Sequence, residues 1–241
     1  SDKHSLSANP VNAIDEDLNG NLWVGTVEGG LNLKNEDSNQ FIHYTTNGNF
    51  LSHNSVSTLE EDKYGNLWIG TWGGGISIFD IKKVPITSPR HLTDPGLDYI
   101  GILKYDPVND GIWICTNRNI FYYDIQTGNL RQPLSNEITQ NIMGTLGCII
   151  DDRNQLWIGC SAGLLLIDIQ SFDHTNYTCN ARFLELDNEE VNKWFLKNIT
   201  SIYQTEDKAI WIGSNGYGMC KLALNGDKYS SEIYTTSQGI A

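Results

Sequence analysis

The chain has 241 residues, of which 39% are hydrophobic, and its 29 Asp and Glu outweigh its 16 Lys and Arg to give a formal net charge of −13. This balance argues against nucleic acid as a partner and against docking on anionic membranes, because both depend on clustered Lys and Arg. The sequence also has no apolar run long enough to span a bilayer, so we expect no direct membrane insertion in this segment.

Five tryptophans, each inside a short apolar segment, recur at intervals of about 45 residues, with a longer last interval. They are Trp23, Trp68, Trp113, Trp157 and Trp211. Each period holds four short apolar segments separated by turn residues and shows no extended 3.6-residue pattern. This combination predicts an all-β fold, a β-propeller with five four-stranded blades, and not a helical repeat.

The repeats cover residues of about 8–50, 51–95, 96–140, 141–190 and 191–241, and we expect residues 1–241 to form a single propeller segment. The predicted strands, in chain order, are 11–14, 22–26, 31–33, 41–44, 56–59, 67–71, 76–79, one within 83–92, 100–104, 112–116, 120–123, one near 130, 146–150, 156–160, 164–167, 181–186, 199–203, 210–214, 219–222 and 231–234. A short surface helix is predicted over 187–197, with Trp194 packed against the core.

Local signals around each tryptophan predict how the blades pack. A glycine follows two residues after the tryptophan in four repeats, where a missing side chain allows another chain segment to approach closely. An aspartate precedes it at the mouth of a turn, and we interpret Asp17, Asp62 and Asp151 as caps of turn amides, since the same residue recurs from repeat to repeat. Cys148 and Cys160 are expected to face each other across one hairpin, although the demanding geometry disfavours a disulfide between them.

The segments DLNGNLWVGT from Asp17 and DKYGNLWIGTWGGG from Asp62, with the fourth strand at 40–44 and the linker at 51–56, resemble the two-component regulator propeller repeat. That repeat fills the periplasmic sensor region of Bacteroides-type hybrid histidine kinase/response regulators. The resemblance implies that the chain is a portion of a larger, seven-bladed propeller, packed against neighbouring blades of the full-length protein. It also implies the periplasmic portion of an inner-membrane protein, a homodimer at full length, and a histidine kinase that receives the signal.

The sequence holds no HExxH, GxSxG or phosphate-binding loop, and its histidines are scattered. We therefore expect no catalytic residue, no metal and no cofactor, and hence no enzyme activity in this segment. The loop between the second and third strands of a blade and the linker to the next blade emerge on one face. The candidate ligand-binding residues on this face are Trp72, His53, Asn54, Asn117, Arg118, Asn119 and Tyr217.

An aromatic ring with nearby amides suits stacking and hydrogen bonding to an oligosaccharide or another small nutrient ligand. Trp72 is the strongest candidate, because other repeats do without an aromatic residue at its position. Two alternatives stay open, a protein–protein interaction scaffold and, less favoured, a propeller glycosidase or polysaccharide lyase. Solvated loop residues with no ligand would also account for each of these positions taken singly.

Overall fold

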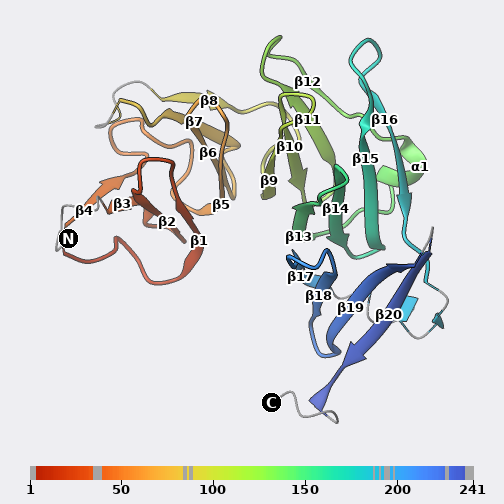
Figure 1. Ribbon diagram of the computed structural model, residues 1–241. Coiled ribbons are helices and arrows are strands. Elements are labelled where there is room, and N and C mark those ends of the chain that lie inside the picture. The colour runs from red at the N-terminus through yellow and green to blue at the C-terminus, as the bar shows by residue number, and fades with distance from the viewer. Residues whose placement is uncertain are drawn as a thin grey trace. The chain divides into compact units, whose positions relative to one another are not determined.

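The computed structural model describes residues 4–34, 40–83, 86, 89–186, 188–189, 191–192, 196–197, 199–225 and 228–236. These residues form twenty strands in five four-stranded sheets and one short helix, α1 (Asn136–Thr139) (Figure 1). The chain divides into two compact units, one of residues 1–107 with 112–116 and one of residues 108–111 with 117–241. The architecture is the predicted all-β one, and each sheet is a blade.

The blades follow one another along the chain, and within each the strands pair in sequence order. Blade 1 holds β1 (Val11–Glu16), β2 (Leu22–Thr26), β3 (Gly30–Lys34) and β4 (Phe41–Tyr44), and blade 2 holds β5 (Val56–Glu61), β6 (Asn66–Thr71), β7 (Ile76–Asp80) and β8 (Arg90–Leu92). Blade 3 holds β9 (Ile100–Asp106), β10 (Gly111–Thr116), β11 (Ile120–Asp124) and β12 (Leu130–Arg131). Blade 4 holds β13 (Thr145–Ile150), β14 (Gln155–Cys160), β15 (Gly163–Asp173) and β16 (Thr178–Phe183), and blade 5 holds β17 (Ile199–Gln204), β18 (Ile210–Ser214), β19 (Gly218–Asn225) and β20 (Lys228–Tyr234).

Every predicted strand overlaps an observed one, and the largest differences lie in blade 4. There β15 runs on to Asp173, and its partner β16 begins at Thr178, before the predicted start. The four-residue helix α1 was not predicted, because a single turn has too little periodicity to register. The helix predicted over 187–197 includes Trp194 and Phe195, which lie outside the described residues.

An aspartate holds the tryptophan indole in four of the five blades. In blade 2, Asp62 Oδ2 accepts the Trp68 Nε1 proton at 2.8 Å, while Oδ1 accepts the backbone N–H groups of Tyr64 and Asn66. The equivalent indole bonds are Trp23 to Asp17 at 2.8 Å, Trp113 to Asp106 at 3.1 Å and Trp157 to Asp151 at 2.9 Å. The predicted turn cap is confirmed, and the same carboxylate also pairs the buried indole N–H.

Blade 5 departs from this arrangement. Counting back six residues from Trp211, Thr205 occupies the aspartate position, and the nearby Asp207 lies two residues later. The Trp211 ring is half-buried, whereas the other four repeat tryptophans are fully buried. It packs on Tyr234, with Lys221 Nζ 5.6 Å from the ring centroid. Four of the five repeat tryptophans therefore lie in the core, and the fifth is only partly covered.

In three repeats, the glycine two residues after the tryptophan gives room to the first strand of the next blade. A Cβ on Gly25 would lie 2.5 Å from Val56 Cγ1, and one on Gly70 would lie 2.6 Å from Ile100 Cγ2. In the second unit Gly159 meets Ile199 in the same way, at 2.4 Å. The predicted close approach is confirmed at these three positions, and it brings β5 against β1 and β2, β9 against β5 and β6, and β17 against β13 and β14.

All five cysteines lie among the described residues, and none of them forms a disulfide. The prediction that Cys148 and Cys160 face each other is wrong, since Cys148 lies opposite Ile158 and Cys160 opposite Thr145. The turn that follows β13 pairs Ile150 with Leu156, and this pairing sets the register of the hairpin.

Candidate functional site

The turn between β6 and β7 is built so that a linker can cross it. Gly73 and Gly75 have φ angles of 116° and 78°, which favour glycine, and Thr71 closes the turn by donating from Oγ1 to the Gly75 carbonyl at 2.8 Å. The His53 ring lies over Gly73, where a Cβ would come within 3.3 Å of it. The glycine run therefore seats the linker that enters blade 2.

A cavity of about 450 Å³ opens beside this turn, and we call it the blade-2 pocket. Its lining includes Gly73, Gly74 and Gly75 of the turn together with the buried Leu51 and Leu97. Hydroxyl, amide, imidazole and carboxylate groups line the rest, including those of Thr46, Asn49, Ser52, His91, Asp94 and Asp98. All of these residues belong to the first unit, and the linkers before and after blade 2 supply most of them.

A short hydrogen-bonded chain orders part of this lining. Ser77, which is fully buried on β7, lies 3.2 Å from Ser52 Oγ and 3.1 Å from His91 Nδ1 through its own Oγ. The same hydroxyl accepts the Ser52 backbone N–H at 2.9 Å. A buried hydroxyl with several partners fixes the orientation of the groups around it, so the Ser52 and His91 side chains are held in defined orientations in the pocket lining.

Two of the predicted ligand residues serve the linker instead of lining the pocket. His53 Nδ1 accepts the Ser55 backbone N–H at 3.0 Å, and Asn54 Oδ1 accepts that of Thr46 at 2.8 Å. The Asn54 carbonyl also accepts the Gly30 N–H at 2.8 Å. Both side chains thus hold the linker in position beside the pocket.

Trp72 is 41% exposed and pairs through a single β-bridge with Tyr99, which is 54% exposed. The two aromatics directly adjoin pocket residues in the sequence, Trp72 before Gly73 and Tyr99 after Asp98. The Trp72 backbone is fixed by its N–H, which donates to the Ser55 carbonyl at 2.9 Å. Tyr99 was missed because it lies in the linker between two blades, which carries no repeated pattern, and only its place just before β9 could have indicated it.

A second cavity, of about 540 Å³, belongs to the second unit, and we call it the blade-3 pocket. The predicted residues Arg118 and Asn119 line it from the turn before β11. Asn136, Thr139 and Gln140 of α1 and its C-cap line it as well, together with Ile142 and Met143 of the following linker. The sequence analysis missed these five.

The two remaining predicted residues lie outside both pockets. The Asn117 carbonyl accepts the Gly144 N–H at 3.0 Å and so ties the linker to the turn. Tyr217 is 40% exposed in the turn between β18 and β19 of blade 5. The structure therefore brings Arg118 and Asn119 into one pocket and places Trp72 next to another, while Tyr217 stands apart in its own blade.

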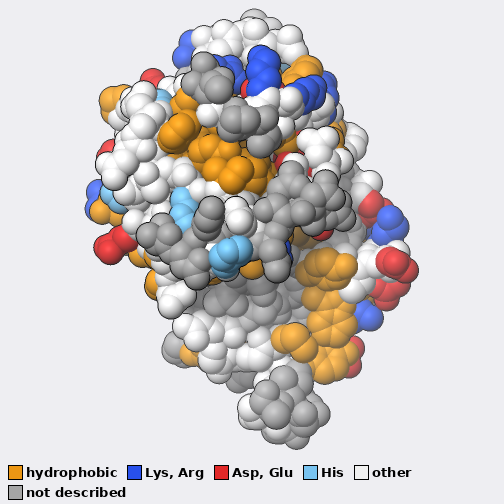
Figure 2. All heavy atoms as spheres, turned by 90° about the vertical axis from the view of Figure 1, so that its left-hand side faces the viewer, with side chains coloured by type: hydrophobic (Ala, Val, Ile, Leu, Met, Phe, Trp, Pro, Cys, Tyr) orange, Lys and Arg blue, Asp and Glu red, His pale blue; other side chains and the backbone are white. Residues whose placement is uncertain are grey.

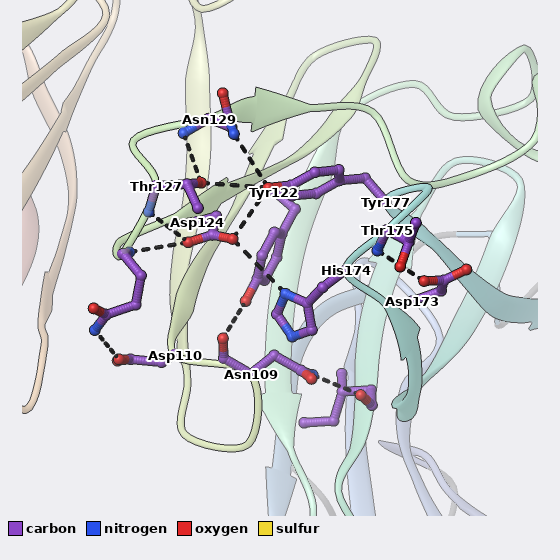
Figure 3. Close-up of polar contacts among 12 residues, drawn as sticks. Asn109, Asp110, Tyr122, Asp124, Thr127, Asn129, Asp173, His174, Thr175 and Tyr177 are labelled. Carbon is purple, nitrogen blue, oxygen red and sulfur yellow. Dashed lines mark hydrogen bonds and ion pairs between the residues drawn. The ribbon is translucent and has the colours of Figure 1, made fainter.

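A third polar cluster lies between the long β15–β16 hairpin and the β11–β12 turn, and its contacts stabilise the fold (Figure 3). The Asp124 carboxylate accepts the N–H groups of Gln126 and Thr127 at 2.9 Å and the Tyr177 hydroxyl at 3.2 Å, and lies 3.7 Å from His174 Nδ1. Phe172 packs on Tyr122 with ring centroids 4.3 Å apart. Both oxygens of the Asp124 carboxylate are therefore already hydrogen-bonded. Because Asp124 belongs to blade 3 and Tyr177 to blade 4, the cluster joins these two blades.

Carboxylates on the first strands of the blades are also engaged. Burial raises the pKa of Glu60, although the Lys104 ammonium at 2.9 Å and the Tyr105 N–H counteract this. Among the described residues, no three His, Cys, Asp or Glu side chains gather as a metal site. No helix in the described part of the chain is long and apolar enough to cross a membrane.

The family model described as the two component regulator propeller matches residues 51–73 and 195–216, as the resemblance predicted. The fold is similar to that of the extracellular domain of a protein described as a hybrid two-component system from B. thetaiotaomicron, with a TM-score of 0.76 and 21% identity over 100% of this chain and 30% of that one. A second such domain from B. thetaiotaomicron gives a TM-score of 0.73 and 21% identity over 99% and 31%.

Virginiamycin B lyase from Staphylococcus aureus is also similar in fold, with a TM-score of 0.65 and 15% identity over 95% of this chain and 71% of that one. The chain spans about 30% of the length of the first structure. No curated protein sequence matches it. These similarities confirm the β-propeller fold.

Proposed function

We propose that this chain, which carries two-component regulator propeller repeats, is part of the extracytoplasmic sensor region of a hybrid two-component system and binds an oligosaccharide nutrient. The full-length protein is then an inner-membrane protein with this portion in the periplasm, and a homodimer whose histidine kinase receives the signal. The segment itself binds and does not catalyse.

The blade-2 pocket carries the proposal. Its lining combines hydroxyl, amide and carboxylate groups that match the hydroxyls of a sugar, and an exposed aromatic pair, Trp72 and Tyr99, adjoins it. Glycines form part of the lining, which lets a ligand approach the main chain closely. The two B. thetaiotaomicron proteins of similar fold, described as hybrid two-component systems, support the sensor role.

The scaffold alternative rests on exposed apolar side chains. Tyr203 is 65% exposed and Met219 40% exposed on blade 5. Hydrophobic side chains also gather in patches on the face of the molecule seen in Figure 2. Such patches are typical of protein interaction sites, so a partner protein that uses them would leave the blade-2 pocket unoccupied.

Titration calorimetry with neutral gluco-, galacto- and manno-oligosaccharides tests the proposal. We expect Trp72→Ala to weaken the binding of the best ligand by about 1–2 kcal/mol, the scale of one aromatic contact, with little change in melting temperature. Tyr64→Ala is the matched control, because Tyr64 is exposed in the turn between β5 and β6, outside the pocket.

Recovery of the ligand unchanged after prolonged incubation is expected for a binding module, whereas cleaved product would indicate an enzyme. Absence of binding to every oligosaccharide, with a partner protein that binds independently of Trp72, would favour the scaffold. Equal losses of affinity in Trp72→Ala and Tyr64→Ala would show that the aromatic pair is not the contact.

A further inference from the structure

The two pockets differ in the charge of their linings. Among the described lining residues, the blade-2 pocket has the acids Asp94 and Asp98 and no Lys or Arg, whereas the blade-3 pocket has Arg118 and no Asp or Glu. In a chain with a net charge of −13, a pocket lined by a cation and lacking an acid is distinctive. The acid nearest in sequence to the α1 lining, Glu137, is not among the lining residues.

The wall of the blade-3 pocket is held in place on two sides. Gly144 N–H donates to the Asn117 carbonyl at 3.0 Å, and Ser161 N–H donates to the Met143 carbonyl at 3.0 Å. The linker that carries Met143 is thus fastened both to the turn before β11 and to the turn before β15. A wall that is fastened before the ligand arrives lowers the ordering cost of binding.

Hydrogen bonds also hold the helical turn α1, which with its C-cap carries the pocket residues Asn136 and Gln140. Gln140 N–H donates to the Asn136 carbonyl at 3.1 Å, and Thr139 Oγ1 donates to the Ser135 carbonyl at 3.3 Å. The backbone bonds of α1 therefore fix the positions from which the Asn136 and Gln140 side chains extend. Together with Asn119 they offer amide donors and acceptors from two separate segments of the chain.

We infer that the blade-3 pocket binds a carboxylate-bearing sugar, the uronic acid unit of an acidic oligosaccharide. The planar guanidinium of Arg118 matches a carboxylate through two parallel hydrogen bonds, which a neutral sugar does not offer. The amides pair with ring hydroxyls, and Met143, which is 63% exposed, offers an adaptable apolar contact to the C–H face of the ring. This inference rests on the proposed function, since it names a ligand class for the same sensor segment.

The test compares a trimer of galacturonic acid with the neutral galactose trimer by titration calorimetry on the whole chain. We expect Arg118→Gln to weaken binding of the acidic trimer at least about tenfold and to leave the neutral trimer unaffected, because one charge-assisted bidentate contact is lost. Arg118→Lys should fall between the two, since it keeps the charge and loses the planar fork. The matched control is Arg153→Gln, because Arg153 is exposed in the same unit and outside both pockets.

Melting curves of the three variants show whether each is folded as the wild type is. Equal affinities of the wild type and Arg118→Gln for the acidic trimer, or equal losses in Arg118→Gln and Arg153→Gln, overturn the inference alone. Full competition by sodium acetate at the same concentration also overturns it, because the pocket would then recognise an anion and not a sugar. If the wild type binds neither trimer nor any other oligosaccharide, this inference and the proposed function fail together.

Discussion

The hydrogen bond between Asp62 and Trp68 makes a measurable prediction about stability. Asp62→Ala removes the acceptor of a buried indole N–H at 2.8 Å, along with the cap on the Tyr64 and Asn66 amides. An unpaired buried donor costs about 1–3 kcal/mol, and a hydrogen bond to a charged group contributes about 1.5–3 kcal/mol. The two figures partly describe the same loss and are not simply added. We therefore expect the free energy of unfolding to fall by about 3 kcal/mol.

Urea unfolding followed by far-UV circular dichroism measures this change without relying on the fluorescence of the affected indole. The matched control is Asp173→Ala, because Asp173 also caps a turn, through the Thr175 N–H at 2.8 Å, but pairs with no tryptophan. We expect the control to leave the unfolding midpoint almost unchanged. A loss below about 1 kcal/mol for Asp62→Ala, or equal shifts in both variants, would refute the role assigned to the indole bond.

Three further predictions concern strain, pH and association. Lys208 has a φ of 68° where Gly65 stands in blade 2, so Lys208→Gly should raise the unfolding free energy by about 1 kcal/mol in the same assay. Burial raises the pKa of Asp17, but hydrogen bonds from Trp23, Asn21 and Asn19 outweigh this effect and leave the pKa below its ordinary value of 3.8. The stability that Asp17 confers is therefore fully present above pH 3.8 and is lost as the pH falls through the lowered pKa of the folded state. The difference in unfolding free energy between wild type and Asp17→Asn should accordingly shrink from about pH 6 to about pH 3. Exposed Tyr203 predicts self-association in sedimentation at micromolar concentration, which Tyr203→Ser should reduce; a strictly monomeric wild type would contradict this.

The blades could be predicted from the sequence because their signal is local and repeated. Trp68, flanked by Leu67 and Ile69 and followed by Gly70, predicts a strand covered on both faces, and the structure buries all four residues. The same pattern in other repeats confirms the period. Packing between neighbouring blades was therefore accessible from the spacing of a few residue types alone.

The turns resisted prediction where a repeat changed length or residue type. Asp106 pairs with Trp113 across a turn one residue longer than the others, so the fixed spacing between aspartate and tryptophan in the other repeats does not identify it. Asp110 occupies the left-handed position, with a φ of 58°. A threonine in place of the aspartate in blade 5 gave no local sign that the tryptophan there would be half-buried.

The pockets were harder to predict, because their linings come from linkers without a periodic pattern. Trp72 stood out as a bulky aromatic residue in a glycine-rich turn, and Arg118 was one of the candidates on the same face; the structure places each in or next to a cavity. Their partners, such as His91 and Gln140, lie far from them in the sequence, and only the fold brings the segments together. The β15–β16 hairpin that carries His174 and Tyr177 likewise gave no signal, since its extension past the regular strand length has no counterpart in other repeats.

The two ends of each blade are under different physical constraints, and this difference connects the fold to the proposed function. At one end, the turn before the second strand must supply a carboxylate to a buried indole, and four blades keep the same solution. At the other end, the turn before the third strand makes no such bond, and the residue four positions after the tryptophan is Trp72 in blade 2, Asn117 in blade 3 and Ser161 in blade 4. We therefore expect the free energy of folding to depend little on which side chain stands there. Both candidate pockets lie at this second end, where residue type can vary to suit a ligand without loss of the blade.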